Sequence, residues 1–278
     1  MIHNDLARLC VHTMTNRPWS LAECIENYGS LGIPAMSVWR NVIDPEEGGI
    51  GIDKAARLVR TSRLRVPALV RGGFFPAPVT EQRVKAIDLN RRCVDEAAAL
   101  GADMVVLVVG AVPHMPLDEA RRQVEDGIVQ LLPHAESCRI RLAIEPLHPM
   151  YAADWSCINS LREARHLWES IQHELLGVVL DVYHVWFDPD LDQEIHLAGK
   201  AGKLFGFHIC DWRVETRSLR SDRGLMGDGC IDLRGIREKV EAAGFTGFHE
   251  VEVFSEEYWN WDQRQYLELI TRRYLEAS

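Results

Sequence analysis

The sequence predicts an α/β protein built as a single (β/α)8 TIM barrel domain over residues 1–278. Short aliphatic segments alternate with longer amphipathic segments along the whole chain, as in parallel strands joined by right-handed helical crossovers. Eight such pairs within 278 residues match the size of a closed barrel. An open doubly wound sheet is the competing fold. It lacks support because no predicted strand is followed by a Gly-x-Gly-x-x-Gly turn.

The first half of the chain supplies four strand–helix pairs. Strands are expected over 9–14, 35–39, 66–71 and 104–109, and helices over 20–32, 52–62, 80–100 and 117–138. Ser20 and Glu23 have the spacing of a capping box at the start of the first helix. Gly101 suits the left-handed residue that ends the third helix. Pro133 is expected to end or bend the fourth helix.

The second half supplies the other four pairs. Strands are expected over 139–144, 178–181, 204–210 and 247–254, and helices over 160–172, 191–202, 233–243 and 256–275. Pro146 stops the fifth strand, because proline cannot donate to the ladder of a central strand. Ser160 or Asn159 is a suitable N-cap for the helix that follows.

Composition limits the classes of function. A formal net charge of −10 disfavours general binding to nucleic acid or to anionic membranes, since phosphate contacts need clustered Lys and Arg. No segment near Met1 resembles a signal peptide, and no apolar run is long enough to cross a bilayer. The seven cysteines show no Cys-x-x-Cys pairing. This usage is typical of a reduced, cytoplasmic protein.

Four residues that can bind a metal come at the ends of the last four predicted strands. They are Glu145, Asp181, His208 and Glu252. Because catalytic groups of a barrel come from the C-terminal ends of its strands, these side chains are expected to converge at the barrel mouth. Three carboxylates and one imidazole suit Mn²⁺, Mg²⁺ or Co²⁺, with Zn²⁺ as a further option. Taken singly, each residue could instead form an ion pair, cap a helix or fill the core.

The eighth strand contains two acids that point to the same face. Glu250 and Glu252 are two residues apart, and Glu252 lies nearer the C-terminal end, so Glu252 is the expected ligand. Glu250, deeper in the strand, is expected either to meet a buried cation such as Arg141 or to replace Glu252 as the ligand.

Several motifs then resemble those of one known family. They are Glu-Pro-Leu-His, Leu-Asp-x-x-His, Phe-His-x-x-Asp, Asp-Arg-Gly-x-x-Gly-Asp-Gly-x-Ile-Asp and Gly-Phe-x-Gly-x-x-x-Val-Glu-x-Phe. Together they resemble the sugar phosphate isomerase/epimerase family. This xylose isomerase-like group of TIM barrels includes inosose isomerases and dehydratases, ketose 3-epimerases, hydroxypyruvate isomerases and endonuclease IV. The resemblance is specific over residues 141–259.

The resemblance implies a role for each matching residue. It makes Glu145, Asp181, His208 and Glu252 the ligands of one divalent ion, most naturally Mn²⁺. Glu145 and Glu252 would also be the catalytic base and acid, on the two sides of an enediolate that the metal stabilises. The implied activity is a metal-dependent sugar or cyclitol isomerase or epimerase. Dehydration of a keto-sugar or inosose is the alternative, because the same intermediate can lose a neighbouring hydroxyl.

Substrate contacts are implied for two further residues. His184 would contact a substrate oxygen, and Arg223 resembles the arginine that binds the far end of the substrate. Arg217 and Arg220 are rivals for the arginine role, because the segment after His208 is longer here than in ketose epimerases.

Four residues near the predicted mouth are less specific. His148 is expected to line the mouth or to shape its loop, and Asp211 to orient His208 or a substrate hydroxyl. His12 and Trp39, at the ends of the first two strands, either form the pocket wall or fill the barrel.

The expected partner is a small sugar or cyclitol, and an uncharged one is favoured because no Gly-rich phosphate cradle follows the last strands. A homodimer or homotetramer would agree with related barrels. DNA repair of the endonuclease IV type is a remote alternative. Its trinuclear zinc site needs further histidines, whereas the third strand here ends Val70-Arg71 and the fourth ends Val109-Gly110.

Overall fold

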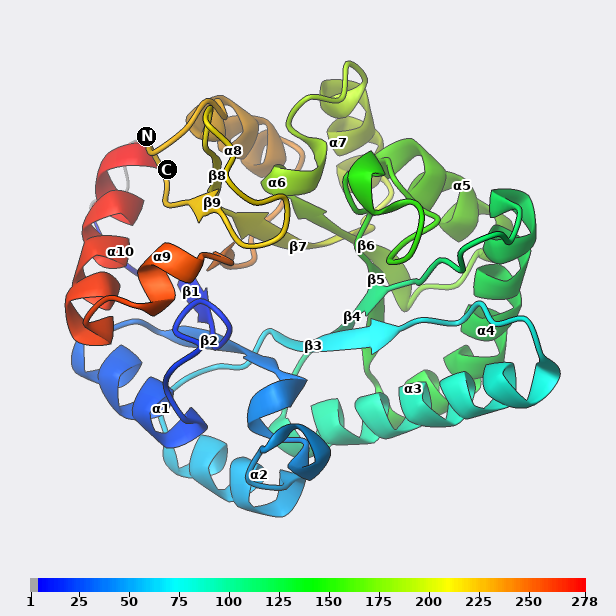
Figure 1. Cartoon of the computed structure of the whole chain (residues 1–278), viewed down its shortest axis with the longest axis horizontal. Coiled ribbons are helices and arrows are strands. Elements are labelled where there is room, and N and C mark those ends of the chain that lie inside the picture. Colours follow the sequence, from blue (N-terminus) through cyan, green and yellow to red (C-terminus); the bar gives the residue numbers. More distant parts are fainter. Residues whose placement is uncertain (1–4) are drawn as a thin grey trace.

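Eight parallel strands form a closed barrel in the computed structural model, which describes residues 5–278 (Figure 1). The strands are β1 (Leu9–His12), β2 (Ala35–Trp39), β3 (Ala68–Gly73), β4 (Met104–Val108), β5 (Arg141–Ile144), β6 (Leu176–Asp181), β7 (Leu204–Ile209) and β10 (His249–Val251). Their order around the barrel follows the chain, and β1 pairs with β10 to close it. The predicted TIM barrel is therefore confirmed.

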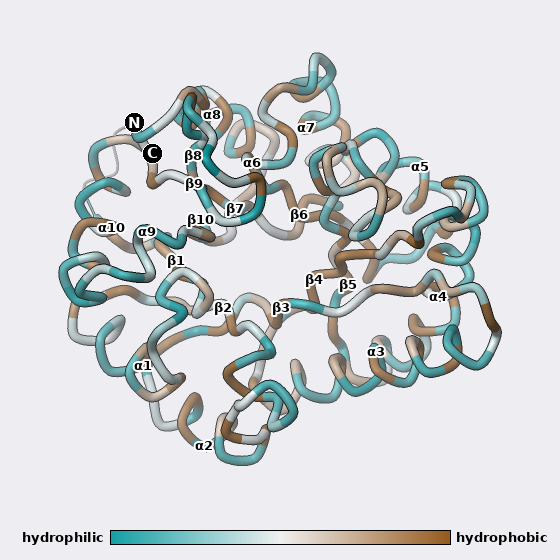
Figure 2. Tube along the Cα trace, in the orientation of Figure 1, coloured by the Kyte–Doolittle hydropathy of each residue, from teal (hydrophilic) through white to brown (hydrophobic). Residues whose placement is uncertain are grey.

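Helices surround the barrel on the outside (Figure 1). The longer ones are α1 (Leu21–Ser30), α2 (Ile52–Thr61), α3 (Thr80–Leu100), α4 (Leu117–Cys138), α5 (Leu161–Ile171), α7 (Leu191–Lys200), α8 (Leu233–Ala242) and α10 (Gln263–Ala277). The predicted capping box starts α1, since Ser20 accepts from the Glu23 N–H and Glu23 accepts from the Ser20 N–H. Figure 2 shows hydrophobic and hydrophilic residues alternating along these helices, as one buried face requires.

The barrel interior has an apolar side and a polar side. Alternate residues of β3 to β6 point inward and form a small apolar cluster, which comprises Ala68, Val70, Met104, Val106, Ala143 and Val179. The side formed by β1, β2, β7 and β10 instead buries His12, Ser37, His208 and Glu250. Polar groups away from water need partners, so this side forms a hydrogen-bonded network that supports the site described below.

Three local details differ from the sequence-based expectations. Helix α4 continues through Pro133 to Cys138. Pro133 has no N–H to donate to the carbonyl of Val129, so one backbone hydrogen bond is lost. Because Val129 is exposed to solvent, the helix tolerates this loss, and packing of its other residues maintains it. The expected last helix is two helices, α9 (Glu256–Trp259) and α10, because Asp262 caps the second by accepting from the Gln265 N–H. The eighth strand is also shorter than expected.

An antiparallel ribbon over the barrel mouth was not predicted. It pairs β8 (Asp211–Trp212) with β9 (Arg223–Gly224). A short helix that was also not predicted, α6 (Val182–Val185), follows β6. Strands of two residues have no periodicity that a sequence could reveal. The ribbon matters because it holds Arg223 over the ends of the strands.

No helix in the part of the chain that the structure describes is both long and apolar enough to cross a bilayer. The cysteines, all of which lie within the described residues, are free thiols.

Substitution of Gly73 is expected to destabilise the barrel more than substitution of Gly101. Both glycines have positive φ, at 110° and 71°. A Cβ at Gly73 would lie 1.9 Å from the Val108 carbonyl oxygen, whereas a Cβ at Gly101 would meet no atom within 4 Å. We expect Gly101→Ala to cost about 1 kcal/mol of backbone strain and Gly73→Ala at least about 3 kcal/mol. Thermal unfolding of the two variants measures this, and equal losses would contradict it.

Candidate active site

The four predicted metal ligands converge at the C-terminal ends of neighbouring strands. Asp181 ends β6 and His208 lies in β7, while Glu145 and Glu252 directly follow β5 and β10. One ligand atom from each side chain lies within 4.8 Å of the other three. All four residues are buried. The barrel therefore gathers three carboxylates and one imidazole at a single place.

Two of the candidate donor atoms are buried close together without a hydrogen-bond partner among the described residues. His208 Nδ1 lies 2.9 Å from Glu145 Oε1, yet the two atoms are not aligned for a hydrogen bond. Within residues 5–278, neither atom has a hydrogen-bond partner. Buried polar atoms rarely lack partners unless an ion or water satisfies them. The residues present thus fit a hard divalent cation such as Mn²⁺ or Mg²⁺.

The charges of the site shift the pKa of its members in opposite directions. Burial lowers the pKa of His208, but the surrounding carboxylates, Glu145 first, outweigh burial and raise it to about 10. Burial raises the pKa of Asp181, against the opposing effect of Arg223. Burial also acts to raise the pKa of Glu252, but His12 and the other nearby cations hold it well below its usual value. With no divalent ion bound, protons supply part of the positive charge.

His12 separates the two acids of the last strand. Its Nε2 lies 3.1 Å from Glu250 Oε2, and its Nδ1 lies 3.0 Å from Glu252 Oε1. The Ser37 hydroxyl also donates to Glu250, at 2.5 Å. Glu250 is thus held deep in the barrel while Glu252 faces the mouth. Arg141, named as a partner for Glu250, instead lies over the ring of Phe205 at 4.9 Å.

A cavity of about 170 Å³ opens beside two of the predicted ligands, Glu145 and Glu252, at the barrel mouth. Glu145, Glu252, His184 and Arg223 line it together with aromatic side chains. Trp39 belongs to this wall and donates to Glu252 at 3.3 Å. His12 by contrast fills the barrel beneath it.

Arg223 is the arginine that reaches the ligands. One terminal nitrogen, Nη1, lies 2.8 Å from Asp181 Oδ2 and 3.0 Å from Glu252 Oε2. The two rivals lie farther out, since their side chains are more than half exposed. Arg217 pairs with Asp222 and Glu257. Arg220 reaches the rim of the cavity, where it pairs with Asp154 at 2.9 Å.

His184 faces two hydrogen-bond donors. Arg223 Nη2 lies 3.1 Å from its Nε2, and the backbone N–H of His148 lies 3.2 Å from its Nδ1. Burial, aided by Arg223, holds the pKa of His184 well below its usual value, so the ring is neutral. A neutral imidazole accepts at one nitrogen only. One of these two donors is therefore free to bind a substrate oxygen.

His148 and Asp211 contact the loops around the cavity. The His148 ring stacks on Trp212 at 5.3 Å, and its Nδ1 accepts from the backbone of Met150. The Asp211 carboxylate accepts hydrogen bonds from four backbone N–H groups, those of Trp212, Gly227, Gly229 and Ile231. Asp211 therefore fixes the loop that follows the antiparallel ribbon.

Sequence reasoning missed part of the cavity wall. Arg71, two residues before the end of β3, lines the cavity, as do the side chains of Tyr151, Trp155 and Phe254. The available signal for Arg71 was its place at the C-terminal end of a strand, directly before two glycines. Tyr151 and Trp155 lie in the segment after β5, for which no structure was predicted, and Phe254 lies beyond the end of β10, within the range expected as a strand.

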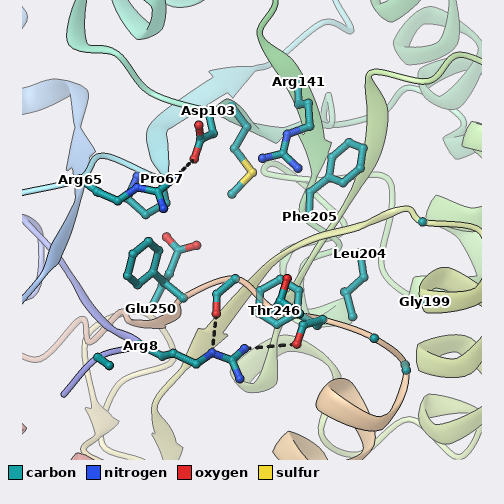
Figure 3. Close-up of a pocket in the computed structure, with 18 residues that line it drawn as sticks. Arg8, Arg65, Pro67, Asp103, Arg141, Gly199, Leu204, Phe205, Thr246 and Glu250 are labelled. Carbon is teal, nitrogen blue, oxygen red and sulfur yellow. Dashed lines mark hydrogen bonds and ion pairs between the residues drawn. The ribbon is translucent and has the colours of Figure 1, made fainter. Parts of the chain in front are cut away.

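A larger cavity, of about 590 Å³, lies at the opposite end of the barrel. The first residues of β4, β5 and β7, which are Met104, Arg141 and Leu204, contribute to its wall. Figure 3 shows Arg141 and Phe205 on one side of it and Arg8 on another. Active sites of TIM barrels lie at the C-terminal ends of the strands, so this cavity is not the candidate site.

Comparison with known proteins identifies the family. Residues 25–272 match the sequence profile of the family described as xylose isomerase-like TIM barrel. The chain belongs to that family. No curated protein matches the chain in sequence.

Solved structures of this barrel type resemble the chain closely. Protein SMc04130 from Sinorhizobium meliloti 1021 is 46% identical, over 98% of this chain and 99% of its own, with a TM-score of 0.93. The IolI protein with a bound zinc atom is 22% identical over 97% of both chains, with a TM-score of 0.84. The D-allulose 3-epimerase of Methylomonas sp. is 18% identical over 96% of this chain and 97% of its own, with a TM-score of 0.74.

Binding of Mn²⁺ is expected to release at least one proton per ion at neutral pH. Ligands must be deprotonated to bind a metal, and the pKa of His208 is raised to about 10. Apparent affinity should therefore rise with pH. Titration calorimetry in two buffers of different ionisation enthalpy measures the proton count. The His166→Asn variant, altered at an exposed histidine, should release the same number. Binding without proton release would contradict the expectation.

Proposed function

We propose that this protein is a divalent-metal-dependent isomerase or epimerase of a sugar or cyclitol. The observation that carries the proposal is the convergence of three carboxylates and one imidazole beside a small cavity at the barrel mouth. Glu145, Asp181, His208 and Glu252 would hold the ion. A bound divalent ion supplies positive charge that makes the C–H beside the carbonyl of an α-hydroxy ketone easier to deprotonate, by stabilising an enediolate.

Glu145 and Glu252 are the proposed base and acid. They follow β5 and β10, and the tips of β6 and β7 lie between them, so the two carboxylates approach the cavity from different sides. Glu252 is ionised, because the nearby cations hold its pKa low. One carboxylate removes a proton from carbon and the other delivers a proton. Delivery to the same carbon from the opposite face gives an epimer, and delivery to the neighbouring carbon gives an isomer.

His184 and Arg223 are the proposed contacts to substrate oxygens. They contact each other at 3.1 Å and both line the cavity. A substrate oxygen that enters between them could accept a hydrogen bond from Arg223. His184 would still accept its hydrogen bond from the backbone N–H of His148. The side chains of Tyr151, Trp155 and Phe254 offer apolar surface for the carbon-bound hydrogens of a sugar.

Related structures support this proposal. Besides the IolI protein and the D-allulose 3-epimerase, the barrel resembles 3-keto-D-glucoside 4-epimerase from E. coli, which is 18% identical over 95% of this chain and 99% of its own, with a TM-score of 0.73. Mn²⁺ is the ion that the oxygen-rich donor set favours, and the zinc of IolI makes Zn²⁺ the second choice. A cytoplasmic enzyme that binds neither nucleic acid nor membrane agrees with the net charge of −10 and the free thiols. A homodimer or homotetramer is part of the same proposal.

Metal-dependent exchange of a substrate proton is the first expected outcome. In D₂O, the Mn²⁺-loaded protein should introduce deuterium beside the carbonyl of at least one compound in a panel of keto-sugars and inososes. The carbon that exchanges, identified by NMR, separates epimerisation from isomerisation, and loss of water would indicate the alternative dehydratase activity. Removal of the ion with a chelator should abolish exchange. Full activity after complete chelation would contradict the proposal.

Loss of either proposed proton-transfer group is expected to lower activity. Glu145→Gln and Glu252→Gln should each reduce kcat/KM by about 10²–10⁴-fold, the usual contribution of a positioned acid or base. Metal content measured on each variant separates lost proton transfer from lost ion binding. Glu26→Gln, at an exposed position of α1, is the matched control. Wild-type turnover in both site variants would rule out the two-carboxylate mechanism.

A further inference from the structure

Arg71 is a cation in the mouth cavity that has no acidic partner. It lies in β3 and lines the cavity. Its Nε is buried without a hydrogen-bond partner. Within residues 5–278, the side chain takes part in no ion pair and no hydrogen bond. The other two arginines of the wall differ, because Arg223 pairs with Asp181 and Glu252, and Arg220 pairs with Asp154.

Three aromatic rings surround the Arg71 guanidinium. Its Cζ lies 4.6 Å from the ring centroid of Phe74, 4.9 Å from that of Trp155 and 5.9 Å from that of Trp39. Rings stabilise a cation through their faces but accept none of its directed N–H bonds. The rings therefore hold the guanidinium in place without satisfying its hydrogen-bonding capacity.

The charges of the rest of the site leave Arg71 unbalanced. A divalent ion would neutralise the three carboxylates of the predicted ligands together with Arg223, which contacts two of them. Deeper in the barrel, His12 lies against Glu250. Burial lowers the pKa of Arg71 despite the attraction of Glu47 and Glu145, because neither carboxylate forms an ion pair with the guanidinium. One positive charge remains for a ligand to neutralise.

We propose that Arg71 binds a carboxylate of the substrate, so that the enzyme acts on a sugar acid or cyclitol acid. The planar guanidinium can donate two parallel hydrogen bonds to a carboxylate. A carboxylate fits better than a phosphate ester, because the cavity of about 170 Å³ is small beside typical ligand pockets of about 300–1,000 Å³. This differs from the uncharged substrate that the sequence favoured. The reaction itself rests on the function proposed above, whereas the choice of substrate class rests on Arg71.

The test compares binding within matched pairs of ketoses on the Mn²⁺-loaded protein. L-Sorbose and 5-keto-D-gluconate share the same ketose end, and the second carries a carboxylate in place of the terminal CH₂OH, away from the carbonyl. D-Fructose and D-fructose 6-phosphate form the phosphate pair. We expect the wild type to bind 5-keto-D-gluconate at least about tenfold more tightly than L-sorbose, the usual gain from a charge-assisted hydrogen bond. The phosphate pair should show a smaller gain.

Substitution of Arg71 should remove the preference selectively. Arg71→Gln should bring the affinity ratio of 5-keto-D-gluconate to L-sorbose close to one, while binding of L-sorbose changes less than about threefold. Arg71→Lys keeps the charge and should keep part of the preference, which remains measurable if the Gln variant folds poorly. Arg91→Gln is the matched control, since Arg91 is exposed on α3 and pairs only with Asp88 among the described residues. It should behave as the wild type.

Three results would overturn the assignment. They are a wild type that does not prefer the acid, a preference that persists in both Arg71 variants, and an Arg71-dependent gain seen only in the phosphate pair. Failure of the proposed reaction would look different. In that case no compound exchanges a proton in D₂O, yet the Arg71-dependent preference for the carboxylate remains in the binding data.

Discussion

Pairing of Cys10 with Glu250 and of Val11 with Val251 joins the first strand to the last. Without this contact the sheet would remain open, and Glu252 would lie at a free edge rather than beside His12. Closure also fixes the ends of β5, β6, β7 and β10 around one axis, because backbone pairing sets the register of each strand with its neighbours, including a shift at Val178/Val179 between β6 and β7. The meeting of four metal-competent side chains is therefore a consequence of backbone hydrogen bonding along the whole barrel.

Closure also concentrates negative charge where water is scarce. Carboxylates in such a place are costly unless cations accompany them. Three positive groups of the chain itself do so, since Arg223 contacts Asp181 and Glu252, His12 contacts Glu252, and His208 lies against Glu145. Burial acts to raise the pKa of both carboxyls, but the pKa of Asp181 is raised and that of Glu252 is lowered, because the cations of the chain stabilise the charge of one carboxylate more than that of the other. A divalent ion would complement these carboxylates, because it would add two positive charges at the point where the candidate donor atoms gather.

The sequence predicted the barrel and the grouping of the four ligands because both depend on a regular feature, an apolar strand that ends in a polar residue. The sequence could not predict that Arg71 lines the cavity, because an arginine near the end of a strand can equally face solvent. Its surroundings come from Trp39, Phe74 and Trp155, which are far apart in the chain. The contacts of Asp211 could not be predicted either, because its oxygens accept from backbone groups up to 20 residues away.

The two unlike sides of the barrel interior differ in how tightly their buried side chains are linked to one another. The polar side under β1, β2, β7 and β10 is crosslinked through His12 and Glu250, so a change there disturbs several buried partners at once. The side under β3 to β6 is lined with small and branched apolar residues that have few directional demands. Substitution of residues near the C-terminal ends of β3 and β4, such as Arg71 and Val108, can therefore change which ligand binds. Substrate specificity could then diverge between related barrels while the proposed reaction stays the same.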